Sequence, residues 1–219
     1  MRNYLAEALG TFAIVFCGTG AIIINAMSDG AISHAGIAIT FGLIVMSMIY
    51  ALGNISGAHF NPAVTIAFYF SGRFPAKEIL PYILAQIIGA LIGSGVLRFL
   101  FPEDTTYYGA TLPAGSDMQS FVMEFILTFL LMLTIIHVAH GSKEQGMIAG
   151  LAIGSVVLLE AMFAGPVCGA SMNPARSLSP ALVSGNLQSL WLYLLAPVLG
   201  AVSAVFVWKL LHAPTGKTA

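Results

Sequence analysis

Long apolar stretches alternate with short polar segments along the whole chain. Six of these stretches are long enough to form helices that cross the hydrocarbon core of a bilayer, which takes about 20 residues. We expect these spanning helices over residues 5–27, 34–52, 79–101, 120–138, 147–164 and 190–211. Two further apolar stretches, 62–70 and 174–182, are too short to cross a bilayer alone.

Each short stretch begins with the same three residues. They are Asn61-Pro62-Ala63 in the first copy and Asn173-Pro174-Ala175 in the second. Asn is a favoured N-cap, Pro suits the first helical position, and the residue before a Pro is held in an extended conformation. The pattern predicts two half-helices, each entered through an extended loop. Because irregular backbone at membrane depth is tolerated only in protein or beside a water-filled cavity, these loops indicate a pore or a cavity.

The composition supports a polytopic membrane protein. Of the 219 residues, 58% are hydrophobic and 8% are charged, and the mean hydropathy is +0.92. These values lie far from those of a soluble domain. The net charge of -1 and the lack of a long basic run give no indication of nucleic acid binding. Cys17 and Cys168 both fall in apolar segments, so no disulfide framework is indicated.

The two halves of the chain match each other in order. Glu7, Asn61 and Tyr82 have counterparts in Glu124, Asn173 and Tyr193, about 111 to 117 residues further on. This nearly constant offset predicts an internal duplication, with one domain over residues 1–219 made of repeats 1–108 and 109–219. Each repeat contains three spans, an odd number, so the second repeat enters the membrane from the opposite side. The N-termini of the two half-helices then meet near the midplane.

Basic and acidic residues fall on opposite sides of this six-span arrangement. The basic side carries Arg2, Arg73, Lys77, Lys143, Lys209 and Lys217, and the other side carries Asp29, Glu103, Asp104 and Asp117. Cytoplasmic loops of membrane proteins carry an excess of Lys and Arg. We therefore expect a multi-pass protein of the cell membrane with both termini in the cytoplasm.

At this point the sequence resembles a known family. The two boxes read Ser-Gly-Ala-His-Phe-Asn-Pro-Ala-Val-Thr at 56–65 and Gly-Ala-Ser-Met-Asn-Pro-Ala-Arg-Ser at 169–177. Together with the duplication, they resemble the aquaporin, or major intrinsic protein, family over essentially the whole chain. The run at 163–177 looks most like the nodulin-26-like branch and its bacterial relatives. The resemblance implies an all-α membrane fold of six transmembrane helices and two re-entrant half-helices in an inverted repeat. It also implies a homotetramer with one pore per subunit and no cofactor or metal.

The loops before the half-helices are the expected pore lining. Asn61 and Asn173 would offer amide donors at the constriction, and each half-helix N-terminus carries about half a positive elementary charge. Both features oppose a cation at the centre of the pore. Alternatively, the two Asn residues act only as N-caps. We expect a ladder of backbone carbonyls from Gly57, Ala58, His59, Gly169, Ala170 and Ser171, which would replace the lost hydration of a neutral solute.

Arg176 is the most informative single charge. Because a guanidinium in hydrocarbon is costly, this side chain should face the bundle interior or water. A structural ion pair with Glu160 is the alternative. By resemblance, and counting from the two boxes, the selectivity filter consists of Phe41, Ala161, Ala170 and Arg176. Ala161 replaces the His typical of water-specific members, which predicts a wider constriction, and Ser177 stands where glycerol facilitators have Asp.

Three acids lie inside predicted spans. An acid at membrane depth is a functional candidate by default. In the family, acids at the positions of Glu7 and Glu124 brace the half-helix loops, and we expect Glu160 to be a buried acceptor for loop amides in the same way. His140, in the short loop after the fourth span, is a candidate for gating.

The sequence contains no catalytic grouping, nucleotide loop or spaced set of metal ligands, so an enzyme is not indicated. We expect a passive channel for water and small uncharged solutes. Silicic acid, boric acid, arsenite and glycerol-like polyols are the expected solutes, and protons and ions are excluded. The alternatives are a strictly water-selective channel, an ion-coupled secondary transporter that uses Glu160, and a junctional membrane protein with a closed pore.

Overall fold

The computed structural model describes residues 1–139 and 146–213, and within them the protein is helical, with no strand. The long helices are α1 (Arg2–Met27), α2 (Ser33–Ser56), α4 (Ala76–Leu100), α5 (Asp117–Val138), α7 (Ala149–Cys168) and α9 (Leu190–Leu211). Each of the six is long and apolar enough to cross a membrane. The two short helices are α3 (Pro62–Phe70) and α8 (Pro174–Ser184). The predicted six spans and two half-helices are confirmed, whereas His140, Lys143 and Lys217 lie outside the described residues.

Several helices extend beyond their predicted ends. The helices α2 and α7 run about one turn past the predicted ends at residues 52 and 164. Each ends at a glycine in the left-handed conformation, Gly57 (φ 86°) and Gly169 (φ 83°), whose N–H closes the last turn. Glycine adopts this conformation without steric cost and is the usual residue after a helix end. In α2 the apolar pattern stops earlier because the last turn carries the polar residues Asn54 and Ser56, and in α7 it stops before Gly165 and Pro166.

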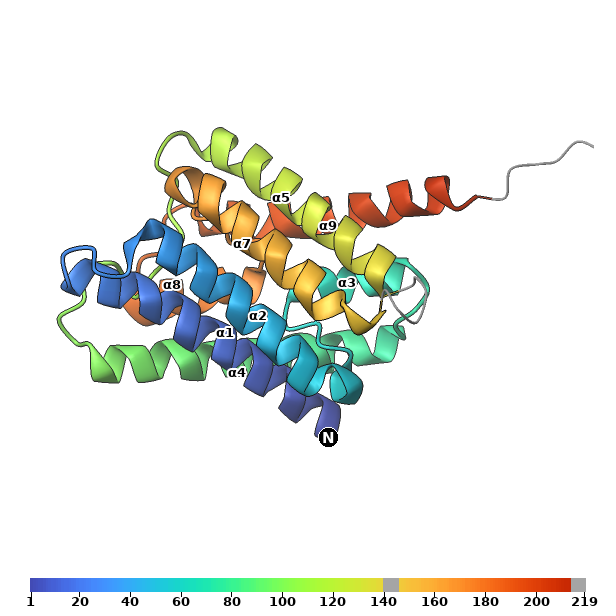
Figure 1. The fold of residues 1–219 in the computed structure, drawn as a ribbon, viewed down its shortest axis with the longest axis horizontal. Coiled ribbons are helices and arrows are strands. Elements are labelled where there is room, and N and C mark those ends of the chain that lie inside the picture. The colour runs from blue at the N-terminus through green and yellow to red at the C-terminus, as the bar shows by residue number, and fades with distance from the viewer. Residues whose placement is uncertain (140–145, 214–219) are drawn as a thin grey trace, which may run out of the picture.

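The half-helices approach from opposite ends of the bundle (Figure 1). Both α3 and α8 pack against α4 and α9. The N-terminus of α1 and the C-terminal end of α9 lie at the same end, to the right in Figure 1. Lys209 in the last turn of α9 reaches the end of α3, where its Nζ donates to the carbonyl oxygen of Phe70 at 2.8 Å.

Close helix contacts depend on two glycines at matching places. A Cβ on Gly89 in α4 would overlap the carbonyl oxygen of Ala8 in α1. A Cβ on Gly200 in α9 would overlap the carbonyl oxygen of Phe125 in α5. These small residues serve helix packing, because any larger residue would push the paired helices apart.

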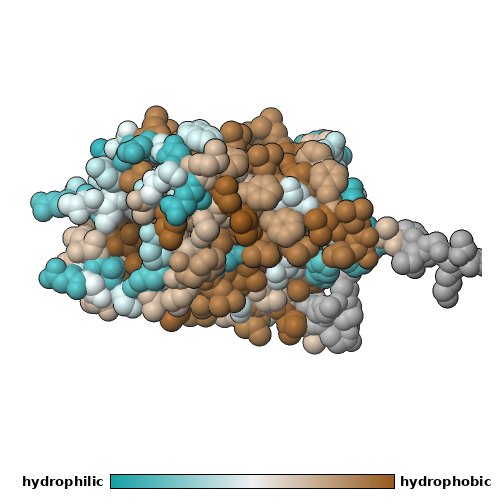
Figure 2. Space-filling view, turned by 90° about the horizontal axis from the view of Figure 1, so that it is seen from above, coloured by the Kyte–Doolittle hydropathy of each residue, from teal (hydrophilic) through white to brown (hydrophobic). Residues whose placement is uncertain are grey.

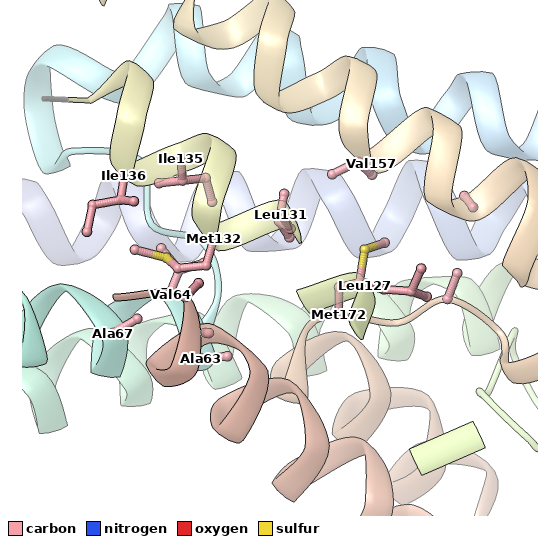
Figure 3. Close-up of a cluster of buried hydrophobic side chains, with 14 of the residues drawn as sticks. Ala63, Val64, Ala67, Leu127, Leu131, Met132, Ile135, Ile136, Val157 and Met172 are labelled. Carbon is pink, nitrogen blue, oxygen red and sulfur yellow. The ribbon is translucent and has the colours of Figure 1, made fainter. Parts of the chain in front are cut away.

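The half-helices are buried by apolar side chains from the spanning helices. Figure 3 shows Val64 and Ala67 of α3 beside Met132 and Ile135 of α5. These residues belong to one buried cluster that also contains Met172 from the loop before α8. Apolar residues also dominate the outer surface, where Leu159 and Phe163 are 62% and 61% exposed. Figure 2 shows hydrophobic residues over much of one face and hydrophilic ones gathered toward one end, as expected for a protein surrounded by lipid.

Candidate pore

The two Asn residues tie the half-helix loops to each other. Asn61 Oδ1 accepts a hydrogen bond from Ala63 N at 2.9 Å, and Asn173 Oδ1 accepts from Ala175 N at 3.0 Å, so both act as N-caps. The amide nitrogens cross to the opposite loop. Asn61 Nδ2 donates to the carbonyl oxygen of Met172 at 2.7 Å, and Asn173 Nδ2 donates to that of Phe60 at 2.9 Å. Each amide keeps one further N–H, and both Asn residues line the cavity described below.

The loops before the half-helices have the same backbone shape. In the first loop, Ala58 (φ 51°) and Phe60 (φ 50°) are left-handed, and in the second loop Ala170 (φ 42°) and Met172 (φ 53°) are left-handed. Non-glycine residues rarely adopt this conformation, and each costs roughly 1–3 kcal/mol unless its surroundings fix it. The loops therefore depend on hydrogen bonds from elsewhere in the fold.

In the first loop, Glu7 of α1 supplies these bonds. Its Oε1 accepts from Ser56 Oγ at 2.7 Å and from His59 N at 3.0 Å. Its Oε2 accepts from Phe60 N at 2.6 Å and from Gln86 Nε2 at 2.8 Å. The carboxylate is fully buried, and four donors satisfy it.

Glu124 of α5 braces the second loop with fewer partners. Its two oxygens accept from Ser171 N at 2.7 Å and Met172 N at 2.8 Å. Glu160 does not take part in this bracing, although the sequence predicted it as a third loop-bracing acid. It is 4% exposed, yet within the described residues neither of its oxygens has a hydrogen-bond partner. The prediction treated Glu160 like Glu7 and Glu124 because all three are acids at membrane depth, but burial alone does not determine which donors a carboxyl group meets.

The four predicted filter residues line one cavity of about 700 Å³. The Arg176 side chain is 3% exposed, and its guanidinium donates to the carbonyl oxygen of Gly109 at 2.7 Å. Its Cζ lies 5.3 Å from the centre of the Phe41 ring, a cation–π distance. Ala161 and Ala170 line the same space with methyl groups. The alternative of an Arg176–Glu160 ion pair is wrong for the part of the chain described here, since the Glu160 oxygens have no partner.

The cavity has one polar side and one apolar side. Of the predicted carbonyl ladder, Gly57, Ala58, His59, Ala170 and Ser171 line it, but Gly169 does not. Gly169 instead packs against Thr111, whose Cγ2 would lie 3.0 Å from a Cβ added at this glycine. The apolar side is formed by Ile14, Val45, Ile49, Val64, Leu131, Ile135 and Val157. The lining extends to Tyr50, Ala139 and Met147, and the end of α5 and the start of α7 lie towards the same end of the bundle as the N-terminus (Figure 1).

Several polar residues at membrane depth were missed by sequence reasoning. Gln86 Nε2 donates both to Glu7 and to Thr65 Oγ1, the latter at 2.9 Å, and Thr65 Oγ1 also contacts His59 Nδ1 at 3.1 Å. The His59 ring stacks on Phe68 with centroids 4.7 Å apart. A buried Gln in a spanning helix is unusual, and that was the available signal. Among the described residues, no three His, Cys, Asp or Glu side chains are placed to hold a metal ion.

Comparisons with a family profile, with related sequences and with a solved structure all lead to the same protein family. A sequence profile for the major intrinsic protein family matches residues 1–208. Over 97% of this chain and 75% of the relative, the sequence is 50% identical to aquaporin NIP1-1 of Zea mays. Over 97% of this chain and 78% of the relative, it is 45% identical to nodulin-26 of Glycine max. The X-ray structure of the aquaglyceroporin from Plasmodium falciparum superposes with a TM-score of 0.87 at 26% identity, covering 97% of each chain. Since the profile covers nearly the whole chain, this protein belongs to the major intrinsic protein family.

Proposed function

We propose that this protein is a passive channel for water and small uncharged solutes. The observation that carries the proposal is the junction of the two half-helices. Their N-terminal ends meet beside one cavity, and Asn61 and Asn173 each donate across to the opposite loop. Two positive helix ends at one point oppose a cation, and Arg176 adds a full positive charge further along the cavity. A neutral solute meets backbone carbonyls, the amides of Asn61 and Asn173, the Arg176 guanidinium and an apolar wall, and it is not repelled by the positive charge.

The solute class follows from the four filter positions. Phe41 and Arg176 supply an aromatic face and a donor, while Ala161 and Ala170 contribute only methyl groups. A filter with two small residues leaves room for solutes larger than water that carry several hydroxyl groups. Glycerol-like polyols and the neutral hydroxides of silicon, boron and arsenic are of this kind. The similarity to proteins named NIP aquaporins and to an aquaglyceroporin supports the same class.

A duplicated architecture with inverted repeats 1–108 and 109–219 is part of the proposal. Matched contacts support it. Tyr82 Oη donates to the carbonyl oxygen of Ser56 at 2.9 Å, and Tyr193 Oη donates to that of Cys168 at 2.7 Å. In the last turn of α4, Arg98 donates to the carbonyl oxygen of Val183 near the end of α8. In the same way, Lys209 in the last turn of α9 donates to the carbonyl oxygen of Phe70 at the end of α3.

The proposed setting is the cell membrane, with both termini in the cytoplasm and four copies in a homotetramer. Arg2, Arg73 and Lys209 lie at the end of the molecule that holds the N-terminus and the last turn of α9, and the Arg73 guanidinium lies over the Trp208 ring at 5.6 Å. The excess of basic residues at that end supports the orientation. Leu43 of α2 and Leu159 of α7 are among many exposed apolar residues that lipid or neighbouring copies would cover.

The test compares the wild type with Ala161→His in proteoliposomes by stopped-flow light scattering. Leu159→His is the matched control, because it places the same side chain on the same helix but on the exposed surface. We expect the wild type to pass water, glycerol and boric acid, and Ala161→His to lose glycerol and boric acid while it keeps water. If the wild type passes only water, Phe41 and Arg176 set the limit and the protein is a water-selective channel. If flux requires a proton gradient, the passive mechanism is wrong.

A further inference from the structure

Three buried hydroxyl groups connect the segment between α4 and α5 to the candidate pore. Thr111 Oγ1 lies 2.7 Å from Ser177 Oγ, and Ser177 Oγ lies 2.5 Å from Ser171 Oγ. Ser171 Oγ lies 3.0 Å from the carbonyl oxygen of Asn173. The three side chains are 6%, 1% and 6% exposed, in that order, so water does not compete strongly for these bonds.

The chain of hydroxyls has a fixed direction. A Ser or Thr hydroxyl has a single proton to donate. Ser171 donates its proton to Asn173, because a carbonyl oxygen can only accept. Ser177 therefore donates to Ser171, and Thr111 in turn donates to Ser177. Thr111 is therefore the first donor in a series of three hydrogen bonds that ends at the backbone carbonyl of Asn173.

The same segment holds the guanidinium of the filter. Gly109, two residues before Thr111, accepts the hydrogen bond of Arg176 through its carbonyl oxygen at 2.7 Å. On the other side of Thr111, Ala114 N donates to the carbonyl oxygen of Val167 at 3.0 Å. Gly109 N donates to Thr106 on the one side, and Thr111 is the next side chain towards α5 that ties the segment to the loop before α8.

We propose that Thr111 is a positioning residue for solute selection. Thr111 lies outside the cavity lining and acts through two neighbours. Through Ser177 it fixes the loop before α8, and through the backbone it fixes the Gly109 carbonyl that holds Arg176. The inference rests on the proposed channel function. When the Thr111 hydroxyl is lost, the Arg176 guanidinium loses its fixed partner and the filter accepts larger solutes.

The test is an isosteric pair of substitutions measured in proteoliposomes. Thr111→Val keeps the shape and removes the hydroxyl, whereas Thr111→Ser keeps the hydroxyl and removes a methyl group. The readout is the permeability to erythritol divided by that to glycerol, with water permeability measured alongside. We expect Thr111→Val to raise this ratio about five-fold, as the loss of one buried hydrogen bond implies. Thr111→Ser should stay near the wild-type ratio.

Two further variants keep the result interpretable. Thr11→Val is the control, because Thr11 is also buried and its hydroxyl, within the described part of the chain, donates to the Glu7 carbonyl of its own helix. Ser177→Ala interrupts the chain at the next hydroxyl and should raise the ratio as Thr111→Val does, with no added effect in the double variant. An unchanged ratio in both Thr111→Val and Ser177→Ala overturns the inference, as does an equal rise in Thr111→Ser or Thr11→Val. A wild type that passes neither water nor glycerol instead rejects the proposed function.

Discussion

The two acids that brace the half-helix loops should differ in how much stability they provide. The informative change is Glu→Gln, which keeps the shape and turns one acceptor oxygen into a donor NH₂ group. Glu7 accepts two hydrogen bonds on each oxygen, so either orientation of the new amide places NH₂ against two donors. Ser56 can turn its hydroxyl and accept, whereas the backbone N–H of His59 cannot.

The magnitude follows from these contacts. One buried backbone N–H left without an acceptor costs about 1–3 kcal/mol. The other hydrogen bonds to residue 7 also become weaker, because a neutral amide oxygen is a weaker acceptor than a charged carboxylate oxygen. We expect Glu7→Gln to lower the free energy of unfolding by about 3–5 kcal/mol, as for other broken buried charged groups. Glu124 has two backbone partners and loses one of them. Glu124→Gln should therefore cost less, about 1–3 kcal/mol.

The assay is thermal denaturation of the purified protein in detergent, followed by size-exclusion chromatography. At about 2–4 °C per kcal/mol, Glu7→Gln should lower the melting temperature by about 6–20 °C. Glu78→Gln is the control, because Glu78 accepts from Tyr4 Oη at 2.7 Å in a part-buried place. A melting temperature for Glu7→Gln equal to the wild type would refute the reasoning. A larger loss in Glu78→Gln or Glu124→Gln would refute it equally.

Two other predictions concern residues inside the bundle. Glu160→Leu should raise the melting temperature by a few degrees and leave water flux unchanged. The reason is that it removes two buried oxygens that have no partner in the described structure. A loss of flux would contradict this prediction and favour a transport role for the acid. Asn61→Asp keeps the cap on Ala63 but cannot donate to Met172, and it adds a negative charge beside the cavity. We expect this variant to leak protons, measured with a pH-sensitive dye inside liposomes, and an unchanged leak would show that Asn61 serves only as a cap.

Much of the candidate site could be predicted because its signals are local. The Asn-Pro pairs mark the half-helix starts, and α3 begins and ends at the predicted residues. Glu7 and Glu124 are single acids in apolar spans, and both meet the expected loop amides. Glu160 is also a single acid in an apolar span, but neither of its oxygens meets a hydrogen-bond donor among the described residues. An apolar sequence around an acid predicts that the acid is buried, but it does not predict which hydrogen-bond donors the carboxyl group meets.

The sequence by itself determined the spans, the half-helices and the family, because hydropathy and Asn-Pro pairs act within a few residues of the chain. Only the tertiary structure decided which distant groups meet. It joined Asn61 to Met172, placed the Gly109 carbonyl on Arg176, and packed Gly169 against Thr111. These contacts link residues that lie 58 to 111 positions apart. They depend on how the described helices pack and on left-handed loop residues, and neither follows from the hydrophobic pattern along the chain.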